Sequence, residues 1–315
     1  MRILHLTDTH LFADPAARHY DRIDTAAALE RVLERLADIA ADRPVDLVLH
    51  TGDASEDASE DSYRRLHAML DPVAAALGAE LLVVMGNHDS SAAYAAVAGP
   101  GDHDAADHDA ADHDADSPRG ASRQDRARTL ASGWRTVVLD SSVPGAGYGR
   151  LDAAQLAWLR EVLAEPSEHG TVLAIHHPPL TAATPLLRAL DLQDRDALAD
   201  AIVGTDVRLI CSGHYHHPMT GALAGVPVHV APGVTNVMDP LSGGGREQAR
   251  ALSGASVIDL GGTDDAADAT AAPVITTAVW PNAGDVLGDG EVPVYDFSQQ
   301  QVAAIIAASV PDGTV

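Results

Sequence analysis

Amide, imidazole and carboxyl side chains gather directly behind one apolar run of this sequence. Residues 81–85 are apolar and partly β-branched, and Gly86, Asn87, His88 and Asp89 follow them. The apolar run predicts a buried strand, and a glycine at its end lets the backbone turn sharply. A polar turn would also accept these residue types, but a buried strand does not require Asn, His and Asp side by side. The stretch therefore predicts a strand that brings three reactive groups to one point.

Four further apolar runs end in the same way. The residues that follow them are Asp8, His10, Asp53, His176, His214 and His216. Asp8 and His10 are two residues apart, and so are His214 and His216. In extended backbone, residues i and i+2 face the same side, so each pair could hold one ion. Sites in α/β sheets form outside the carboxyl ends of the strands, so these side chains are expected to share one site.

The candidate ligands offer nitrogen and oxygen atoms and no thiolate. Such a set suits Mn, Fe or Zn ions better than a cysteine-type zinc site. The candidates are Asp8, His10, Asp53, Asn87, His176, His214 and His216. They are too many for one ion, and two ions that share a bridging carboxylate fit better. We therefore expect two divalent or trivalent ions, with Fe and Mn favoured and Zn and Co as alternatives.

Along the chain around these residues, apolar runs alternate with helical patterns. This alternation predicts an α/β fold with crossover connections. A strand over 2–6 precedes a helix that runs from Asp24 or Thr25 to about Ala41. Later strands are expected at 45–50, 134–139, 171–175 and 207–211, and helical stretches at 151–163 and 192–203. After Met219, the short runs 226–230, 256–260 and 274–279 predict antiparallel strands.

Residues 99–128 interrupt this alternation with low-complexity sequence. Asp-His-Asp-Ala-Ala recurs with a period of five and places His103, His108 and His113 in equivalent positions. A five-residue step rotates a helix by roughly 140°, so these histidines would not share one face. The segment is predicted to be a solvated surface loop, with weak metal gathering as the alternative.

The chain of 315 residues is strongly acidic, with a formal net charge of −26 and 46% hydrophobic residues. Its length allows one large domain or two smaller ones. An acidic surface repels nucleic acid at long range, which argues against a DNA- or RNA-binding function. If the substrate is an anion, the site itself must supply positive charge.

Cys211 is the only cysteine, so no intrachain disulfide forms, and a small buried hydrophobe is the expected role. The sequence starts directly on a strand, with no basic or apolar leader. It also has no apolar run that approaches the length of a membrane span. We expect a cytoplasmic protein without stable membrane insertion, with peripheral association with the cell envelope as an alternative.

The motifs in order resemble those of the calcineurin-like metallophosphoesterases, most closely the bacterial class III cyclic-nucleotide phosphodiesterases. They are Asp8-x-His10, Gly52-Asp53, Gly86-Asn87-His88-Asp89, His176 and Gly213-His214-x-His216, supported by residues 138–145 and 174–179. The resemblance implies an α/β fold, a four-layer α/β/β/α sandwich of two mixed sheets, completed in its second sheet by the strands after His216. The resemblance covers a catalytic domain over 1–280, in which the 99–128 loop departs from the family's pattern. The C-terminal tail over 281–315 is a second departure, and its sequence predicts a short helix at 301–308.

The same resemblance implies a role for each residue of the motifs. One ion would be held by Asp8, His10, Asp53 and His216, and the other by Asp53, Asn87, His176 and His214. The shared Asp53 would bridge the ions, which clamp a displacement at phosphorus and generate a bridging hydroxide near neutral pH. The catalytic residues would be His88 and Asp89. His88 would stabilise the phosphate charge and help to protonate the leaving oxygen, and Asp89 would orient His88.

Several polar residues near these motifs keep open assignments. His177 would either support a ligand or line the pocket, and His50 is expected to be buried and hydrogen-bonded. His19 and Tyr20 lie in the first loop, where a base could stack. His217 and His229 are expected to be structural or exposed. The acidic run over 55–61 is expected to be the solvated entry of a helix.

The resemblance favours a phosphodiesterase that acts on 3′,5′-cyclic AMP, on 2′,3′-cyclic nucleotides, or on both. Alternatives are a glycerophosphodiester or broad-specificity phosphodiesterase with the same metals, and a non-catalytic scaffold of the same fold. A nuclease fits the acidic charge less well. The expected partner is a small phosphodiester rather than nucleic acid, and the tail could support a homodimer.

Overall fold

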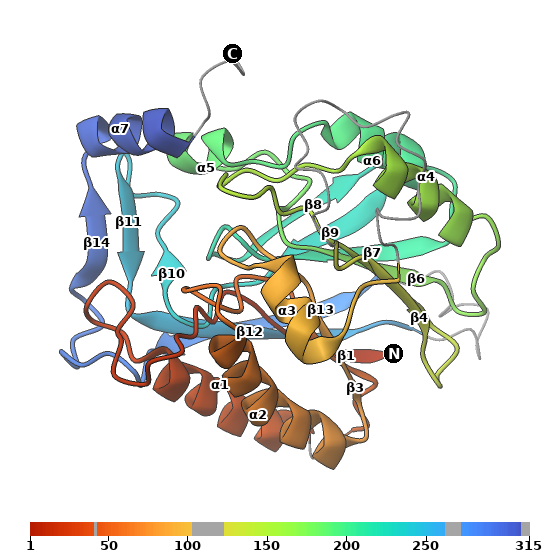
Figure 1. Ribbon diagram of the computed structural model, residues 1–315, viewed down its shortest axis with the longest axis horizontal. Helices are drawn as coiled ribbons and strands as arrows, with labels where there is room; N and C mark the ends of the chain where they lie inside the picture. The colour runs from red at the N-terminus through yellow and green to blue at the C-terminus, as the bar shows by residue number, and fades with distance from the viewer. Residues whose placement is uncertain (41–42, 103–122, 262–271, 310–315) are drawn as a thin grey trace.

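Two large sheets pack face to face, and helices cover their outer faces (Figure 1). The computed structural model describes residues 1–40, 43–102, 123–261 and 272–309. One sheet contains strands from both the early and the late part of the chain. The arrangement confirms the predicted four-layer α/β/β/α sandwich of two mixed sheets.

The first sheet has the order β13-β12-β1-β2-β3. Its strands are β1 (Arg2–Leu6), β2 (Leu47–His50), β3 (Glu80–Val83), β12 (Leu252–Asp259) and β13 (Val274–Pro281). β1, β2 and β3 are parallel, and their crossovers are α1 (Thr25–Ala40) and α2 (Glu60–Leu77), with α3 (Ser91–Ala98) after β3. β12 pairs antiparallel with β1. The expectation that all late strands complete the second sheet is therefore wrong for β12 and β13, because β1 leaves an edge that β12 fills.

The second sheet has the order β4-β5-β6-β7-β9-β8. Its strands are β4 (Arg126–Thr129), β5 (Arg135–Leu139), β6 (Thr171–Ile175), β7 (Val207–Ser212), β8 (Met219–Leu223) and β9 (Val226–Val230). α4 (Ala153–Val162), α5 (Pro185–Ala189) and α6 (Arg195–Ile202) lie in its connections. β5, β6 and β7 are parallel. Their carboxyl ends, like those of β1 to β3, carry the motif residues.

Alternation along the strands divides the apolar side chains between two kinds of core. Ile3 packs between the two sheets, whereas Leu4 and Leu6 pack against the helices of the first sheet. Trp134 and Cys211 also fill the space between the sheets. Burial of each large apolar side chain contributes roughly 1.5–3 kcal/mol, so this double core fixes the strand ends firmly. The buried position of Cys211 confirms the prediction from sequence.

A third, small sheet stands to one side of the two large ones (Figure 1). It joins β10 (Val237–Met238), β11 (Glu247–Arg250) and β14 (Pro293–Phe297), and α7 (Gln299–Ser309) follows it. The helix was expected from the sequence, but the strand β14 was not. Across the described ranges, none of the helices combines the length and apolarity that crossing a bilayer requires.

Candidate metal centre and active site

The predicted ligands come together beyond the carboxyl ends of five strands. Asp8 and His10 follow β1, Asp53 follows β2, Asn87 follows β3, His176 follows β6, and His214 and His216 follow β7. The potential ligand atoms of Asp8, His10, Asp53 and His216 lie within 4.8 Å of one another, and so do those of His176, His214 and the neighbouring His177. Asn87 joins the second group through its amide. Strands of both sheets thus end at one buried point.

The first group consists of Asp8, His10, Asp53 and His216. The Nε2 atoms of His10 and His216 lie 3.3 Å apart. Nε2 of His216 also lies 3.3 Å from Oδ1 of Asp8, and Nε2 of His10 lies 3.8 Å from Oδ2 of Asp53. Asp8, His10 and Asp53 are buried. These four side chains aim their donor atoms into one small space.

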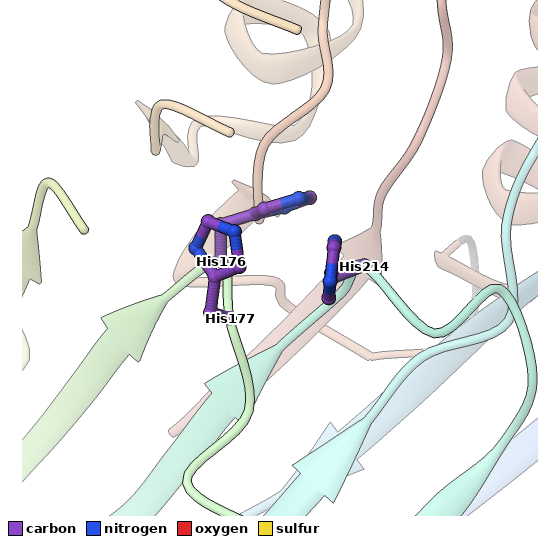
Figure 2. Close-up of side chains that lie close together, drawn as sticks. All are labelled: His176, His177 and His214. Carbon is purple, nitrogen blue, oxygen red and sulfur yellow. The ribbon is translucent and has the colours of Figure 1, made fainter. Parts of the chain in front are cut away.

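The second group is built around His176. Its Nε2 lies 3.3 Å from Oδ1 of Asn87 and 3.4 Å from Oδ2 of Asp53. The His214 ring lies 5.1 Å from the His176 ring, centroid to centroid, and Figure 2 shows the two rings beyond the ends of neighbouring strands. Oδ2 of Asp53 therefore faces a histidine of each group.

The remaining ring nitrogen of each histidine is held by an acceptor outside the groups. Because that nitrogen must carry the proton, the other nitrogen keeps its lone pair for an ion. Such outer partners are typical of metal-binding histidines. The pairs are His10 Nδ1 with Glu56 at 2.7 Å, His176 Nδ1 with the Thr51 carbonyl at 2.7 Å, His214 Nε2 with the Leu190 carbonyl at 3.0 Å, and His216 Nδ1 with the Asn236 side chain at 3.1 Å.

This pattern of protons makes the first group fit a cation. Two lone-pair nitrogens, on His10 and His216, face each other beside the carboxylate of Asp8. Oδ1 of Asp8 is buried without a hydrogen-bond donor. Acceptors gathered in this way repel one another unless positive charge lies between them. The oxygen and nitrogen donors match Mn, Fe or Zn.

The pKa shifts of His176 and Asp53 also show that the site favours positive charge. Burial alone would lower the pKa of His176, but the carboxylate of Asp53 outweighs burial and raises that pKa to about 9. Burial would likewise raise the pKa of Asp53, but His176 and His88 hold it well below its usual value. Asp53 is therefore a carboxylate that stabilises any cation placed beside it.

Glycines let the strand ends approach this closely. A Cβ on Gly86 would lie 2.2 Å from Oδ1 of Asp53, and a Cβ on Gly213 would lie 1.9 Å from Oγ1 of Thr7. Neither Gly86 nor Gly213 has a positive φ angle. Gly86 was expected to allow a sharp turn. Its observed role is instead to leave room for the carboxylate of Asp53.

The backbone at the ligands is left-handed rather than extended. The φ angles are 57° at Asp8, 43° at His10, 51° at Asp53, 67° at His214 and 51° at His216. The expectation that each i and i+2 pair lies in extended backbone is therefore wrong, and His214 and His216 fall in different groups. Such conformations cost of order 1–3 kcal/mol each and persist where the surroundings enforce them, typically at functional sites.

His88 lies at the edge of the first group, and Glu56 holds it there. Nδ1 of His88 lies 3.2 Å from Oε2 of Glu56, the oxygen that also accepts from His10. The side chain of His88 is 40% exposed. Burial would lower its pKa, but Asp53 and Glu56 outweigh burial and raise the pKa to about 10. His88 is thus a cationic, accessible group beside the centre.

Asp89 does not orient His88, contrary to expectation. Its carboxylate accepts the backbone N–H groups of Gly86, Ala54 and Ser55 at 2.8–3.1 Å. Burial and the charge of Asp53 raise its pKa to about 6. Asp89 therefore ties the loop after β3 to the loop after β2, and so fixes the distance between Asn87 and Asp53.

Comparisons with known proteins agree with this geometry. Residues 1–218 match the family model described as calcineurin-like phosphoesterase. The chain belongs to this family.

Relatives of this phosphoesterase include curated bacterial proteins. It is 36% identical to a probable cyclic nucleotide phosphodiesterase of Rhodococcus erythropolis, over 75% of this chain and 72% of the relative. It is also 36% identical to a cAMP/cGMP dual specificity phosphodiesterase of Mycobacterium tuberculosis, over 75% and 68%. A 3′,5′-cyclic adenosine monophosphate phosphodiesterase of Pseudomonas aeruginosa is 32% identical, over 68% and 69%.

Solved structures show the same fold. A dimetal phosphatase from Danio rerio aligns with a TM-score of 0.55 and 14% identity, over 82% of this chain and 95% of the other. A purple acid phosphatase from yellow lupin, Lupinus luteus, aligns with a TM-score of 0.51 and 12% identity, over 100% and 57%. At these identities the likeness concerns the fold alone.

The remaining histidines of the phosphoesterase fall into clear classes. His177 lies beside His176 and His214 (Figure 2), with its ring 4.5 Å from that of His214. Both of its ring nitrogens are engaged, by Oγ of Ser141 at 2.8 Å and the Gly147 carbonyl at 3.3 Å. His50 is buried and bonded to Thr9, as predicted. Also as predicted, the buried histidines His217 and His229 are structural. His103, His108 and His113 lie outside the described residues.

Glu56 is the residue that the sequence pattern missed. It was expected in the solvated entry of a helix, yet it contacts His10 and His88 and lies 3.6 Å from Nδ1 of His19. His10 and His88 hold the pKa of Glu56 well below the usual value, against the effect of burial. Its position three residues after Asp53 is the signal that could have identified it, because the loop that carries Asp53 also passes His10.

Proposed function

We propose that this phosphoesterase hydrolyses cyclic nucleotides at a centre of two metal ions. The observation that carries the proposal is the division of seven donor residues into two groups that meet at Oδ2 of Asp53. Two-ion centres of this kind suit in-line displacement at phosphorus. The names of the bacterial relatives support a cyclic phosphodiester as the substrate.

The two donor groups support a proposed set of ligands for each ion. Asp8, His10 and His216 would hold one ion, Asn87, His176 and His214 would hold the other, and Asp53 would bridge them. When bound, the ions polarise the phosphoryl group and supply a nucleophile from water near neutral pH. Fe and Mn suit the oxygen and nitrogen donors, with Zn and Co as alternatives. Bound ions would also make the site locally positive, so that it could attract a phosphate despite the protein's net charge of −26.

His88 would act on the leaving group. Hydrolysis joins a water oxygen to phosphorus, breaks one ring P–O bond, and transfers a proton to the ester oxygen that leaves. Because Glu56 holds Nδ1 of His88, the Nε2 atom is the one that can give that proton. The carboxylates of Asp53 and Glu56 raise the pKa of His88, and a protonated imidazole suits both proton donation and stabilisation of phosphate charge.

The experiment compares substrates with the manganese-loaded protein. Turnover is measured with 3′,5′-cyclic AMP, 2′,3′-cyclic AMP and glycerophosphocholine, for the wild type and for His88→Ala. We expect turnover of a cyclic nucleotide and a loss of roughly 100-fold or more in kcat for the variant. A matched control is His67→Ala, since His67 pairs with Asp71 on the surface of α2 much as His88 pairs with Glu56.

The possible outcomes separate the candidate functions. Hydrolysis of glycerophosphocholine alone would replace the cyclic substrate with a glycerophosphodiester. No hydrolysis by protein with both ions bound would favour a scaffold. Undiminished activity of His88→Ala would overturn the role given to His88.

A further inference from the structure

A series of aromatic rings leads from the metal centre to the C-terminal segment. The His10 ring stacks on His19 at 4.6 Å between centroids, and His19 meets Tyr20 edge-on at 4.4 Å. Tyr20 in turn lies 5.0 Å from Tyr295 of β14. Two ring-to-ring steps therefore separate a predicted metal ligand from Tyr20. Tyr20 belongs to the loop after β1, and Tyr295 lies outside the residues 1–218 that match the family model.

Tyr20 is partly exposed to solvent although its ring contacts those of His19 and Tyr295. The residue is 47% exposed, so a ligand beside the loop could reach it. Its φ angle is 51°, a left-handed conformation that a bulky residue rarely adopts without a reason. His19, one residue before it, pairs with Ile23 and closes the loop into a tight turn. The backbone is thus shaped to present this ring.

Arg22 fixes this loop to the segment that carries Tyr295. Its guanidinium forms a two-pronged ion pair with Asp285, at 2.7 Å from Nε and 2.6 Å from Nη2. It also donates to the carbonyls of Asp289 at 2.6 Å and Val292 at 3.0 Å. The side chains of Arg22 and Asp285 are only 7% and 2% exposed. Figure 1 shows the loop after β1 reaching towards β14, so the two segments form one wall.

We propose that this wall is the base-binding part of the substrate site, with the ring of Tyr20 as the surface on which the nucleobase stacks and Tyr295 as its support. This inference rests on the proposed function, since the phosphate must lie at the metal centre. Stacking on an aromatic ring accepts any base, because every base has a π face. Stacking also requires no basic side chain on the protein, which agrees with the formal net charge of −26.

The assignment makes the C-terminal segment part of the catalytic unit. Tyr295 backs Tyr20, and Asp285 holds Arg22, so both lie in the region expected to be a tail. Arg22 acts as a positioning residue, because its contacts are with the wall and not with the centre. The base would be recognised by shape and stacking rather than by hydrogen bonds that select one base.

The test removes the ring while keeping the backbone. Tyr20→Asn is the chosen variant, because asparagine tolerates left-handed φ angles better than other residues do. Tyr20→Phe keeps the ring. Val203→Asn is the matched control, because Val203 is 62% exposed directly after α6 and makes none of the contacts that form the wall. Each protein is assayed with 3′,5′-cyclic AMP and with the same cyclic ribose phosphate lacking a base. Binding of the product adenosine 5′-monophosphate is compared with that of ribose 5-phosphate by calorimetry.

We expect Tyr20→Asn to raise KM for cyclic AMP and Kd for adenosine 5′-monophosphate by about tenfold or more, as base stacking predicts. The constants for the base-free compounds should stay unchanged, Tyr20→Phe should keep the stacking surface, and Val203→Asn should behave like the wild type. Equal weakening of both kinds of compound, or no change in either, would overturn the assignment. A wild type that hydrolyses the base-free compound as well as cyclic AMP would instead contradict the proposed substrate.

Discussion

At the scale of single residues, the protonation of each histidine carries the argument for a metal centre. His10, His176, His214 and His216 each give one N–H to an outer acceptor and turn the other nitrogen inward. The sequence predicted which residue types would meet. It could not show which nitrogen faces inward, because the outer acceptors are two backbone carbonyls and two side chains that only the folded chain brings to these histidines.

Glu56 gives the first prediction at this scale. Glu56→Gln keeps an acceptor for Nδ1 of His10 but removes the charge that fixes His88. We expect kcat for the cyclic substrate to fall roughly 10- to 100-fold, as for other outer partners of metal ligands. Steady-state kinetics measure this change, with the exposed Glu60→Gln on α2 as a control. An unchanged kcat would mean that Glu56 is only part of the surface.

At the scale of elements, periodicity located the strands and helices but not the partners of every strand. The runs at 256–260 and 274–279 were recognised as antiparallel strands, yet they join β1 rather than the second sheet. Alternating apolar residues look the same in either sheet, so only the packed chain decides. β14 was missed because it is short and half-exposed, and because its one strand partner is β11 of the small sheet.

The anchor of the second sheet yields a prediction about stability. Asp125, just before β4, accepts the backbone N–H of Asp140 at 2.7 Å and the Gln155 amide of α4 at 3.0 Å. Burial, and then the charge of Asp140, raise its pKa to about 8. A carboxyl group with a raised folded-state pKa binds its proton more tightly in the folded protein, so stability falls as pH rises from about 4 to about 8.

Asp125→Asn should therefore flatten this part of the pH profile. The amide keeps an oxygen for the two donors and carries no charge to bury, so the variant should be at least as stable as the wild type at pH 8. Thermal unfolding between pH 5 and pH 8 measures the difference in Tm. A wild type and variant that lose stability in parallel over this range would show that Asp125 is not the titrating group.

At the scale of the whole molecule, both large sheets and the early and late parts of the chain converge on one edge. The predicted fold and the meeting of all seven ligand candidates follow from strand order and the rule for carboxyl ends. The wall formed by Arg22, Asp285 and Tyr295 does not, since it depends on a contact between segments 263 residues apart. A homodimer and the identity of the metals stay predictions.

The most direct test of the central claim is the number of ions that each folded chain binds. Native mass spectrometry of manganese-loaded protein measures this number for the wild type and for Asp53→Asn. The account predicts two ions per chain in the wild type and the loss of at least one when the shared carboxylate is neutralised. A wild type that binds a single ion at saturation, or an Asp53→Asn variant that keeps both, would contradict a centre bridged by Asp53.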